Sequence, residues 1–353
     1  MELRVANSVD RDEWDGLVKS LGGAIFHSCV WADYIRAGHA NVQPRFARWV
    51  SDGGETIGLA LMFAEISARK VLAPLTGILR TDAAPLIGDG CADASLAFAQ
   101  AIENYARSEN IATLSVGSFG GNAGMTAFQQ LGFRQTRYWE FALDLSPAED
   151  VLWEAMEYKR HKNIRKAARL GVALEDQNGE DGIANLRRLQ GASSERIVAR
   201  GGQDITRKGE PLADPVKVLL DSGLGRIVCA RVEGQVVSTG LFTRFGSVVY
   251  HTLSGHGEGA LRSQAPTFLL WETIKRYKAE GARWFNFGGC SVAAAEEGHP
   301  EHGVYAYKKD FGGQRLDCIT FDKVLFPIRH GIGSLLKRAG RGLARQPMRR
   351  KHV

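Results

Sequence analysis

Glycines at alternating positions give one segment the composition of an anion-binding loop. Gly255, Gly257 and Gly259 follow a strand-like run, 248–253, and precede a helical run, 266–277. A glycine-rich loop entering a helix exposes backbone N–H groups and the positive end of the helix dipole, which attract pyrophosphates and carboxylates. We therefore expect these glycines to bind an anionic substrate group, with a plain surface loop as the alternative. The formal match to a dinucleotide fingerprint lacks the acid after the next strand that would bind a ribose hydroxyl.

Positive charge is concentrated in a second segment. Six Lys and Arg residues fall within positions 159–169, among them Lys159 and Arg165. Arg165 and Arg169 are four residues apart and share one face of a helix. Such a cluster suits the phosphates of a nucleotide-linked or lipid-linked compound, or of tRNA, and Arg262 beside the glycines suits the same role. The alternative is an ordinary solvated helix face.

Several other chemistries are disfavoured by spacing. His251, His256, His299, His302 and Cys290 match no standard structural zinc pattern, so no metal site is expected. Cys290 with a nearby histidine is a weak candidate for a nucleophile. The chain contains neither a Gly-x-Ser-x-Gly elbow nor a Gly-x-x-x-x-Gly-Lys-Ser/Thr loop.

Length and composition indicate a globular chain of two domains. The 353 residues are 44% hydrophobic and 24% charged, and no apolar run is long enough to span a membrane. The net charge of +6 arises at the C-terminal end: nine of the 45 bases follow Asp322, and the remaining 36 face 39 acids. A uniformly basic nucleic-acid-binding domain is thus disfavoured. Five scattered cysteines and an N-terminal segment without an apolar core favour a cytoplasmic protein.

The order of expected elements repeats along the chain. A hairpin over 45–63, a helix over 92–108, a strand over 111–116, a helix over 121–131 and a strand over 133–145 form the first half. A hairpin over 226–242, a strand, a helix over 266–277 and a strand over 283–287 ending at Gly288 and Gly289 form the second. Residues 102–105 align with 274–277, and 54–57 with 234–237. Two tandem α/β (α+β) domains follow, each a mixed, mostly antiparallel sheet flanked by helices.

We place the domain boundary near Ser146-Pro147. The expected domains are residues 1–147 and 148–328, with a helical stretch over 148–169 linking the copies or beginning the second. Residues 329–353 are an expected basic tail. Its apolar residues recur at helical spacing from Ile332 to Leu343, with bases on the other side. This pattern suits an anionic membrane surface or, equally, a helix docked on the body.

Four segments carry a resemblance to a known family: 26–31, 159–172, 285–289 and 302–313, the last with a Tyr-Lys-x-x-Phe-Gly motif. Together they resemble the FemAB family of peptidoglycan-bridge aminoacyltransferases and related acyltransferases of the GNAT superfamily. Arg134 after Gln130-Leu-Gly-Phe133 is similar to a signature of GNAT domains. The resemblance spans about residues 20–325 and implies two GNAT-like domains, with transfer of an acyl or aminoacyl group to an amine.

The resemblance also assigns roles. Lys308 matches the family's motif lysine and is expected to stabilise a tetrahedral intermediate or to bind a phosphate, whereas Asp82 is expected to accept or orient the amine proton. His27, Trp31 and Tyr34 are expected to line the acceptor site, unless they are core residues. Further substrate-binding residues are Lys159, Arg165, Arg262 and Tyr307, and Gly255, Gly257 and Gly259 are expected to contact the donor.

The resemblance implies no tightly bound cofactor. Its co-substrate is acyl-CoA or aminoacyl-tRNA, and its acceptor is a cell-envelope precursor, peptidoglycan or polysaccharide, either a small molecule or lipid-linked, reached at the inner membrane face. Bridge enzymes carry a long coiled-coil arm that this chain lacks, and the pyrophosphate loop of ordinary GNAT enzymes is reduced to 257–264. The alternatives are an acyl-CoA-dependent N-acetyltransferase acting on a small amine or amino sugar, a non-catalytic binding module, and an RNA-binding protein.

Overall fold

The computed structural model describes residues 1–65, 73–88, 94–121, 125–202, 204 and 212–332. The chain forms two compact units, each assembled from separate segments. The first unit contains residues 1–13, 41–136 and 320 onward, and the second contains residues 14–40 and 137–319. The predicted basic tail, from residue 333 on, lies outside the described residues.

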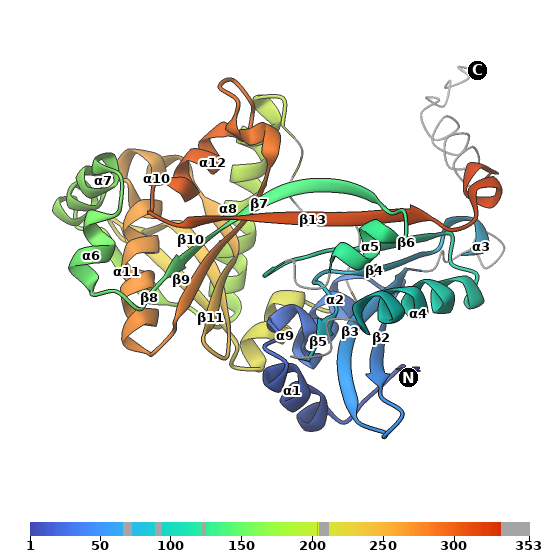
Figure 1. The fold of residues 1–353 in the computed structure, drawn as a ribbon. Helices are drawn as coiled ribbons and strands as arrows, with labels where there is room; N and C mark the ends of the chain where they lie inside the picture. Colours follow the sequence, from blue (N-terminus) through green and yellow to red (C-terminus); the bar gives the residue numbers. More distant parts are fainter. Residues whose placement is uncertain (66–72, 89–93, 122–124, 203, 205–211, 333–353) are drawn as a thin grey trace, which may run out of the picture. The chain divides into compact units, whose positions relative to one another are not determined.

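The first unit is built on a mixed sheet with the strand order β1-β2-β3-β4-β6-β13, and β5 pairs with β3. Its strands are β1 (Glu2–Ala6), β2 (Val42–Val50), β3 (Thr56–Glu65), β4 (Ile78–Thr81), β5 (Leu86–Ile87) and β6 (Thr113–Val116). Its helices are α3 (Ala73–Thr76), α4 (Ala94–Ser108) and α5 (Thr126–Gln130). The predicted hairpin and the helix ending at residue 108 are confirmed (Figure 1). The ring of Phe98 on α4 stacks on Trp49 of β2, 5.5 Å between centroids.

The second unit is also built on a mixed sheet, with the order β13-β7-β12-β11-β10-β9-β8. Its strands are β7 (Arg134–Asp144), β8 (Ala173–Asp176), β9 (Gly225–Val232), β10 (Gln235–Phe245), β11 (Val248–His256), β12 (Trp284–Ser291) and β13 (Gln314–Val324). The hairpin of β9 and β10 is antiparallel, whereas β11 and β12 run parallel, with α11 as their connection. A helical connection of this kind is what parallel neighbours require.

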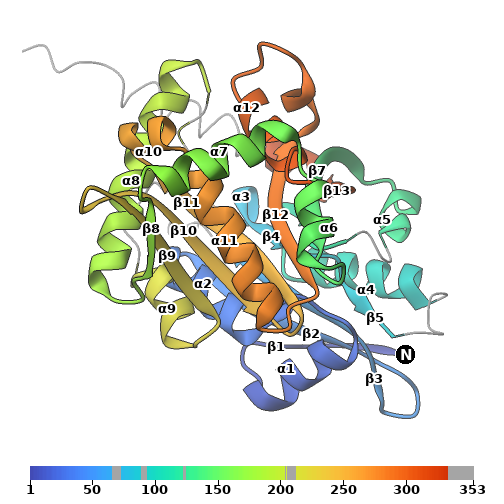
Figure 2. The ribbon, with the colours of Figure 1, turned by 90° about the vertical axis from the view of Figure 1, so that its left-hand side faces the viewer.

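Helices cover the second sheet (Figure 2). They are α1 (Arg11–Ser20), α2 (Cys29–Gly38), α6 (Glu149–Glu154), α7 (Tyr158–Arg169), α8 (Glu180–Ala199), α9 (Pro215–Asp221), α10 (Glu258–Ser263), α11 (Ala265–Ala279) and α12 (His302–Lys309), with the 3-10 turns η1 (Ile25–His27) and η3 (Val292–Ala295). The apolar side of α11 packs with α7 on β10, β11 and β12, where Phe242, Phe285 and Phe287 are fully or almost fully buried. The predicted helical stretch 148–169 is confirmed and consists of two helices, α6 and α7.

The α2 helix begins with a side-chain cap. The Ser28 side chain accepts a hydrogen bond from the Trp31 backbone N–H, at 3.1 Å, and so satisfies one of the free donors of the first turn. Trp14 on α1 is fully buried, and its indole Nε1 donates to the His27 carbonyl at 2.7 Å. These two bonds connect α1, η1 and α2 within the second unit.

The last strand of each half of the chain pairs with a strand of the other half. β7, from the first half, is antiparallel to β12, whereas the end of β13, from the second half, is antiparallel to β6. The compact units therefore do not follow the linear division at residue 147. That division describes the internal repeat and stays a prediction. The repeat itself is visible in the matched parallel pairs, β4 with β6 and β11 with β12.

Candidate functional site

Two parallel strands separate in the middle of the second sheet. β11 and β12 pair from Val248 with Trp284 to Tyr250 with Asn286. Beyond this point β11 continues to pair with β10, and β12 continues to pair with β7. We call the place where they part, His251 on β11 with Gly288 and Gly289 on β12, the β11–β12 fork. Backbone groups at such a point lose their partner in the sheet and become available to other groups.

The β12 side of the fork is a bulge. The register against β7 shifts between Asn286 and Gly289, and Gly288 has a φ of +78°, which favours glycine. The Gly288 N–H donates to the Asn286 side-chain oxygen at 2.7 Å. The strand was predicted to end at Gly288 and Gly289; it runs on to Ser291 because the bulge lets Gly289 pair again with Glu140.

Lys308 reaches the fork from the last turn of α12. Its Nζ donates to the Gly289 carbonyl oxygen at 2.7 Å. Burial lowers the pKa of Lys308 from its usual value near 10.5 to about 8, and the Cys290, Glu140 and Glu301 groups offset this in part. The predicted motif lysine thus lies at the strand separation as a half-buried ammonium group that can lose its proton near pH 8.

His251 lies on the opposite side of the fork. Its ring stacks on Phe242 with centroids 4.9 Å apart, and its buried Nε2 has no hydrogen-bond partner among the described residues. Burial and the nearby Lys308 charge lower the pKa of His251 to about 3, so the imidazole is neutral at physiological pH. In the sequence His251 appears only as an isolated histidine within a strand, and no spacing signal marks it.

A buried ion pair fixes α12 to α7. Asp310, just after α12, binds Arg160 at 2.8 Å and Lys159 at 2.6 Å. The Arg160 guanidinium lies over the Tyr307 ring, 4.6 Å from its centroid. Burial raises the pKa of the Tyr307 phenol. Two predicted substrate-binding residues, Lys159 and Tyr307, thus gather with Lys308 at one helix junction, and their contacts there are structural ones.

The remaining predicted bases lie on exposed helix surfaces. Arg165 on α7 is exposed and lies over Trp153, 5.5 Å from the ring centroid. Arg262 on α10 is 77% exposed and faces Glu258 at 3.4 Å. Both are accessible to an anionic ligand, and their binding of phosphates stays a prediction.

The predicted glycine-rich loop is absent from this part of the described chain. Gly255 lies within β11, Gly257 precedes α10 and Gly259 belongs to α10. A Cβ atom on Gly255 would lie 2.6 Å from the Gln190 backbone nitrogen of α8. The prediction of a loop is wrong because close packing of α8 on β11 explains this glycine. The donor-binding role of the three glycines stays a prediction.

This packing makes a testable prediction. Gly255→Ala forces the α8 backbone away from β11 and should lower the free energy of unfolding by about 1–3 kcal/mol. Gly259→Ala is the control, because its Cβ would lie at an ordinary 3.4 Å from Val237, and alanine favours a helix. Urea unfolding of both variants checks the prediction. Equal midpoints for the two variants would contradict it.

Asp82 lies in the first unit, immediately after β4. Its side chain forms an ion pair with Arg80, which also binds Glu65 at 2.7 Å. Its carbonyl oxygen would lie 2.6 Å from a Cβ on Gly117, so the chain is tightly packed there. Asp82 thus follows β4, whose partner β6 is the parallel counterpart of β12 in the repeat, and its predicted role toward the amine stays a prediction.

The predicted aromatic wall is part of the second unit's core. His27, Trp31 and Tyr34 are 5–6% exposed. The Trp31 ring stacks on Tyr34 at 4.7 Å and contacts Phe26 edge-on at 4.9 Å. Packing accounts for these residue types, and their role at an acceptor site stays a prediction.

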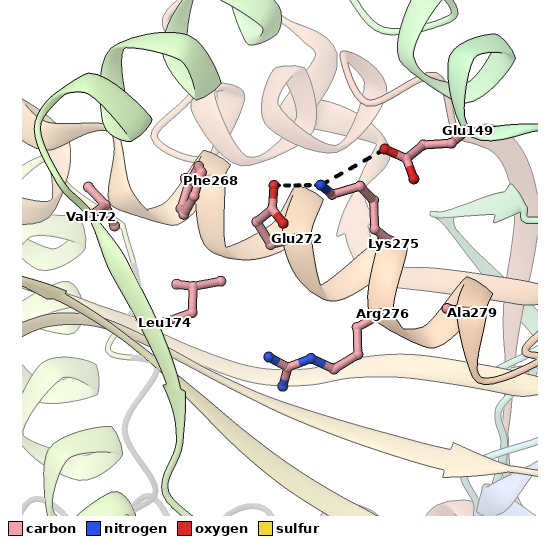
Figure 3. Close-up of a pocket in the computed structure, with 8 residues that line it drawn as sticks. All are labelled: Glu149, Val172, Leu174, Phe268, Glu272, Lys275, Arg276 and Ala279. Carbon is pink, nitrogen blue, oxygen red and sulfur yellow. Dashed lines mark ion pairs between the residues drawn. The ribbon is translucent and has the colours of Figure 1, made fainter.

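A pocket of about 520 Å³ lies along α11 (Figure 3). Glu149, Glu272 and Lys275 line it together with apolar side chains, and Lys275 pairs with both carboxylates, as the dashed lines mark. None of the predicted site residues lines this pocket. Since its ammonium and carboxylate groups are already paired with each other, we do not place the chemistry there.

The described residues offer neither a metal-binding cluster nor a membrane-spanning helix. They contain no group of three or more His, Cys, Asp or Glu side chains that could hold a metal ion. Within the same residues, no helix combines the length and the apolar character that crossing a bilayer would need.

Comparison with known proteins defines the class of the fold. Residues 156–309 match the model of the acetyltransferase (GNAT) domain, and all of them belong to the second unit. No curated protein matches the chain significantly.

Solved structures extend the likeness to nearly the whole chain. A crystal structure of FemX superposes with a TM-score of 0.74 at 15% identity, covering 95% of this chain and all of that one. The structure of L-PGS from Bacillus licheniformis superposes with a TM-score of 0.56 at 12% identity, covering 94% of this chain and 97% of that one. The C-terminal domain of a putative lysylphosphatidylglycerol synthetase from Agrobacterium fabrum superposes with a TM-score of 0.55 at 13% identity. This match covers 92% of this chain and 96% of that one. The predicted fold class and the resemblance to FemAB and GNAT proteins are thus confirmed at the level of the fold.

Proposed function

We propose that the protein is an N-acyltransferase whose chemistry takes place at the β11–β12 fork. The observation that carries the proposal is the Lys308 ammonium, held at the strand separation by its 2.7 Å bond to the Gly289 carbonyl. Its half-buried position strengthens its field toward a negative charge that develops beside it. The GNAT domain match over residues 156–309 includes this lysine.

The reaction joins a neutral amine to an activated acyl group. The amine nitrogen attacks the acyl carbonyl carbon, and the C–N bond forms as the carbonyl oxygen becomes an oxyanion. Collapse of this intermediate breaks the bond to the thioester sulfur or ester oxygen of the donor. The proton lost by the amine ends on that leaving group, so the products are an amide and a thiol or alcohol. Protonated Lys308 stabilises the oxyanion.

For the acceptor we propose an amine on a cell-envelope precursor. Support comes from the FemX fold and from the synthetase named in a second similar structure, lysylphosphatidylglycerol synthetase. The exposed bases of α7, Arg165 among them, suit the phosphates of a nucleotide-linked or lipid-linked precursor. The acceptor would then bind at two separate places, with its amine at the fork and its phosphates on α7.

The donor is proposed to be acyl-CoA or aminoacyl-tRNA, and calorimetry separates the two. The purified protein is titrated with acetyl-CoA and a longer acyl-CoA. Saturable binding in the micromolar range assigns acyl-CoA as the donor. If neither binds, retention of charged tRNA on filters should show the second donor. The absence of binding to both donors would contradict the proposed function.

A further inference from the structure

The lysine at the fork is held in place by a chain of buried polar groups that starts on the neighbouring strand. Glu140 on β7 is 1% exposed and accepts a hydrogen bond from the Asn286 Nδ2 at 2.9 Å. The Asn286 side chain, 2% exposed, uses its oxygen to accept from the Gly288 N–H at 2.7 Å. The next residue, Gly289, offers its carbonyl to Lys308. Three successive hydrogen bonds thus connect a buried carboxylate to the lysine.

Each hydrogen bond of this series uses a different donor or acceptor group. An amide side chain both donates and accepts, so Asn286 can bind a carboxylate on one side and a backbone N–H on the other. Gly288 supplies the positive φ that turns the bulge, and no larger residue adopts it readily. A buried asparagine with both ends satisfied has one orientation, and the bulge it holds also has one geometry.

From this geometry we infer that Asn286 and Glu140 are positioning residues for the proposed acyl transfer: the Glu140 carboxylate fixes the Asn286 amide, and Asn286 holds the bulge that anchors Lys308. The inference rests on the proposed function for its catalytic meaning, whereas the placement of Lys308 can be measured without any substrate. Neither Asn286 nor Glu140 belongs to the Tyr-Lys-x-x-Phe-Gly motif that contains Lys308.

The charged and titratable groups facing Lys308 come from four elements. They are Glu140 on β7, Cys290 on β12, His251 on β11 and Glu301 just before α12. Glu140, Glu301 and Cys290 favour the protonated lysine, whereas burial disfavours it. Neutral His251 contributes no charge at physiological pH. Removing the charge of Glu140 should therefore move the titration of Lys308 to lower pH.

Variants of Glu140 and Asn286 should shift the pKa of Lys308 in opposite directions. Glu140→Gln keeps an oxygen to accept from Asn286, so the bulge stays while the charge is lost, and the pKa of Lys308 should fall below 8. Asn286→Ala removes both side-chain bonds and frees the bulge, so Lys308 loses its anchor, turns toward water, and its pKa should rise toward 10.5. A residue that merely filled space would not give this pair of results.

Trace acetylation of the full chain with acetic anhydride across pH 6–11, read by mass spectrometry at Lys308, measures both shifts without any transfer reaction. Asn185→Ala and Glu272→Gln are matched controls, because they remove an amide and a carboxylate elsewhere in the same unit. We expect opposite shifts in the two test variants and none in the controls. An unshifted Lys308 in a folded Asn286→Ala variant, or an unshifted or raised one in Glu140→Gln, would overturn the inference.

If Asn286→Ala fails to fold, Glu140→Gln alone decides by the direction of its shift. Because this readout is independent of transfer, a protein that transfers no acyl group can still show both shifts. Failure of the proposed function and failure of the positioning inference are therefore distinguishable. Where transfer is measurable, the alkaline limb of kcat should move with the titration of Lys308 in both variants.

Discussion

Lys308→Ala should lower kcat by about 10²–10³-fold, the usual effect of removing one group that stabilises an oxyanion. The reason is the position of its Nζ, which donates to the Gly289 carbonyl at the β11–β12 fork. KM should change much less, because the ammonium acts on charge that develops during the reaction. Steady-state kinetics with the assigned donor measure both quantities.

The same lysine predicts how activity depends on pH. Because the pKa of Lys308 is lowered to about 8, the protonated form is lost as the pH rises through 8, and kcat should fall there. Lys308→Arg keeps a cation at all working pH values, so this alkaline limb should disappear while part of the activity remains. If the alkaline limb stays near pH 8 in the Lys308→Arg variant, the limb belongs to another group.

Asp310→Asn should be the most destabilising single change at the site. Asp310 and Arg160 form a pair whose side chains are both about nine-tenths buried. Removing the charge leaves the buried Arg160 guanidinium without the carboxylate that pairs with it, and breaking such a pair costs about 3–5 kcal/mol. Urea unfolding monitored by circular dichroism measures the loss. Transfer activity should fall as well, since Asp310 is two residues beyond Lys308.

Two controls separate a buried charge from a general effect of mutation. Asp221→Asn removes an exposed ion pair with Lys217 in the same unit and should change the unfolding free energy by less than about 1 kcal/mol. Replacing both partners, Arg160→Met with Asp310→Leu, should recover much of the lost stability because no unpaired buried charge remains; Lys159, the other partner of Asp310, is 58% exposed. If Asp310→Asn is as stable as Asp221→Asn, the pair of Arg160 and Asp310 contributes little to stability.

Local patterns predicted much of the fold. The hairpin of β2 and β3 and the helices α4 and α11 follow from turn residues and periodicity, which act over a few residues. The exchange of β7 and β13 between the halves was not predicted, because strand pairing over long sequence distances leaves no local signature.

The site shows the same limit. Lys308 was predicted from its motif, and the structure places it at the fork. Asn286 stands in the motif 285–289, but its bond to Glu140 joins residues 146 positions apart, and nothing in the sequence marks that partner. Gly255 was misread as part of a loop because a close approach of α8 selects glycine as strongly as a phosphate loop does.

Transfer of an acyl group to an amine increases the mass of the acceptor, and this increase can be measured by mass spectrometry. The protein is incubated with a nucleotide-linked peptidoglycan precursor and, in turn, acetyl-CoA, a longer acyl-CoA and a mixture of charged tRNAs. We expect a precursor heavier by one acyl or aminoacyl residue with one of these donors, and far less of it with Lys308→Ala. Unchanged precursor mass with every donor, or equal product with the Lys308 variant, would contradict the proposed acyl transfer.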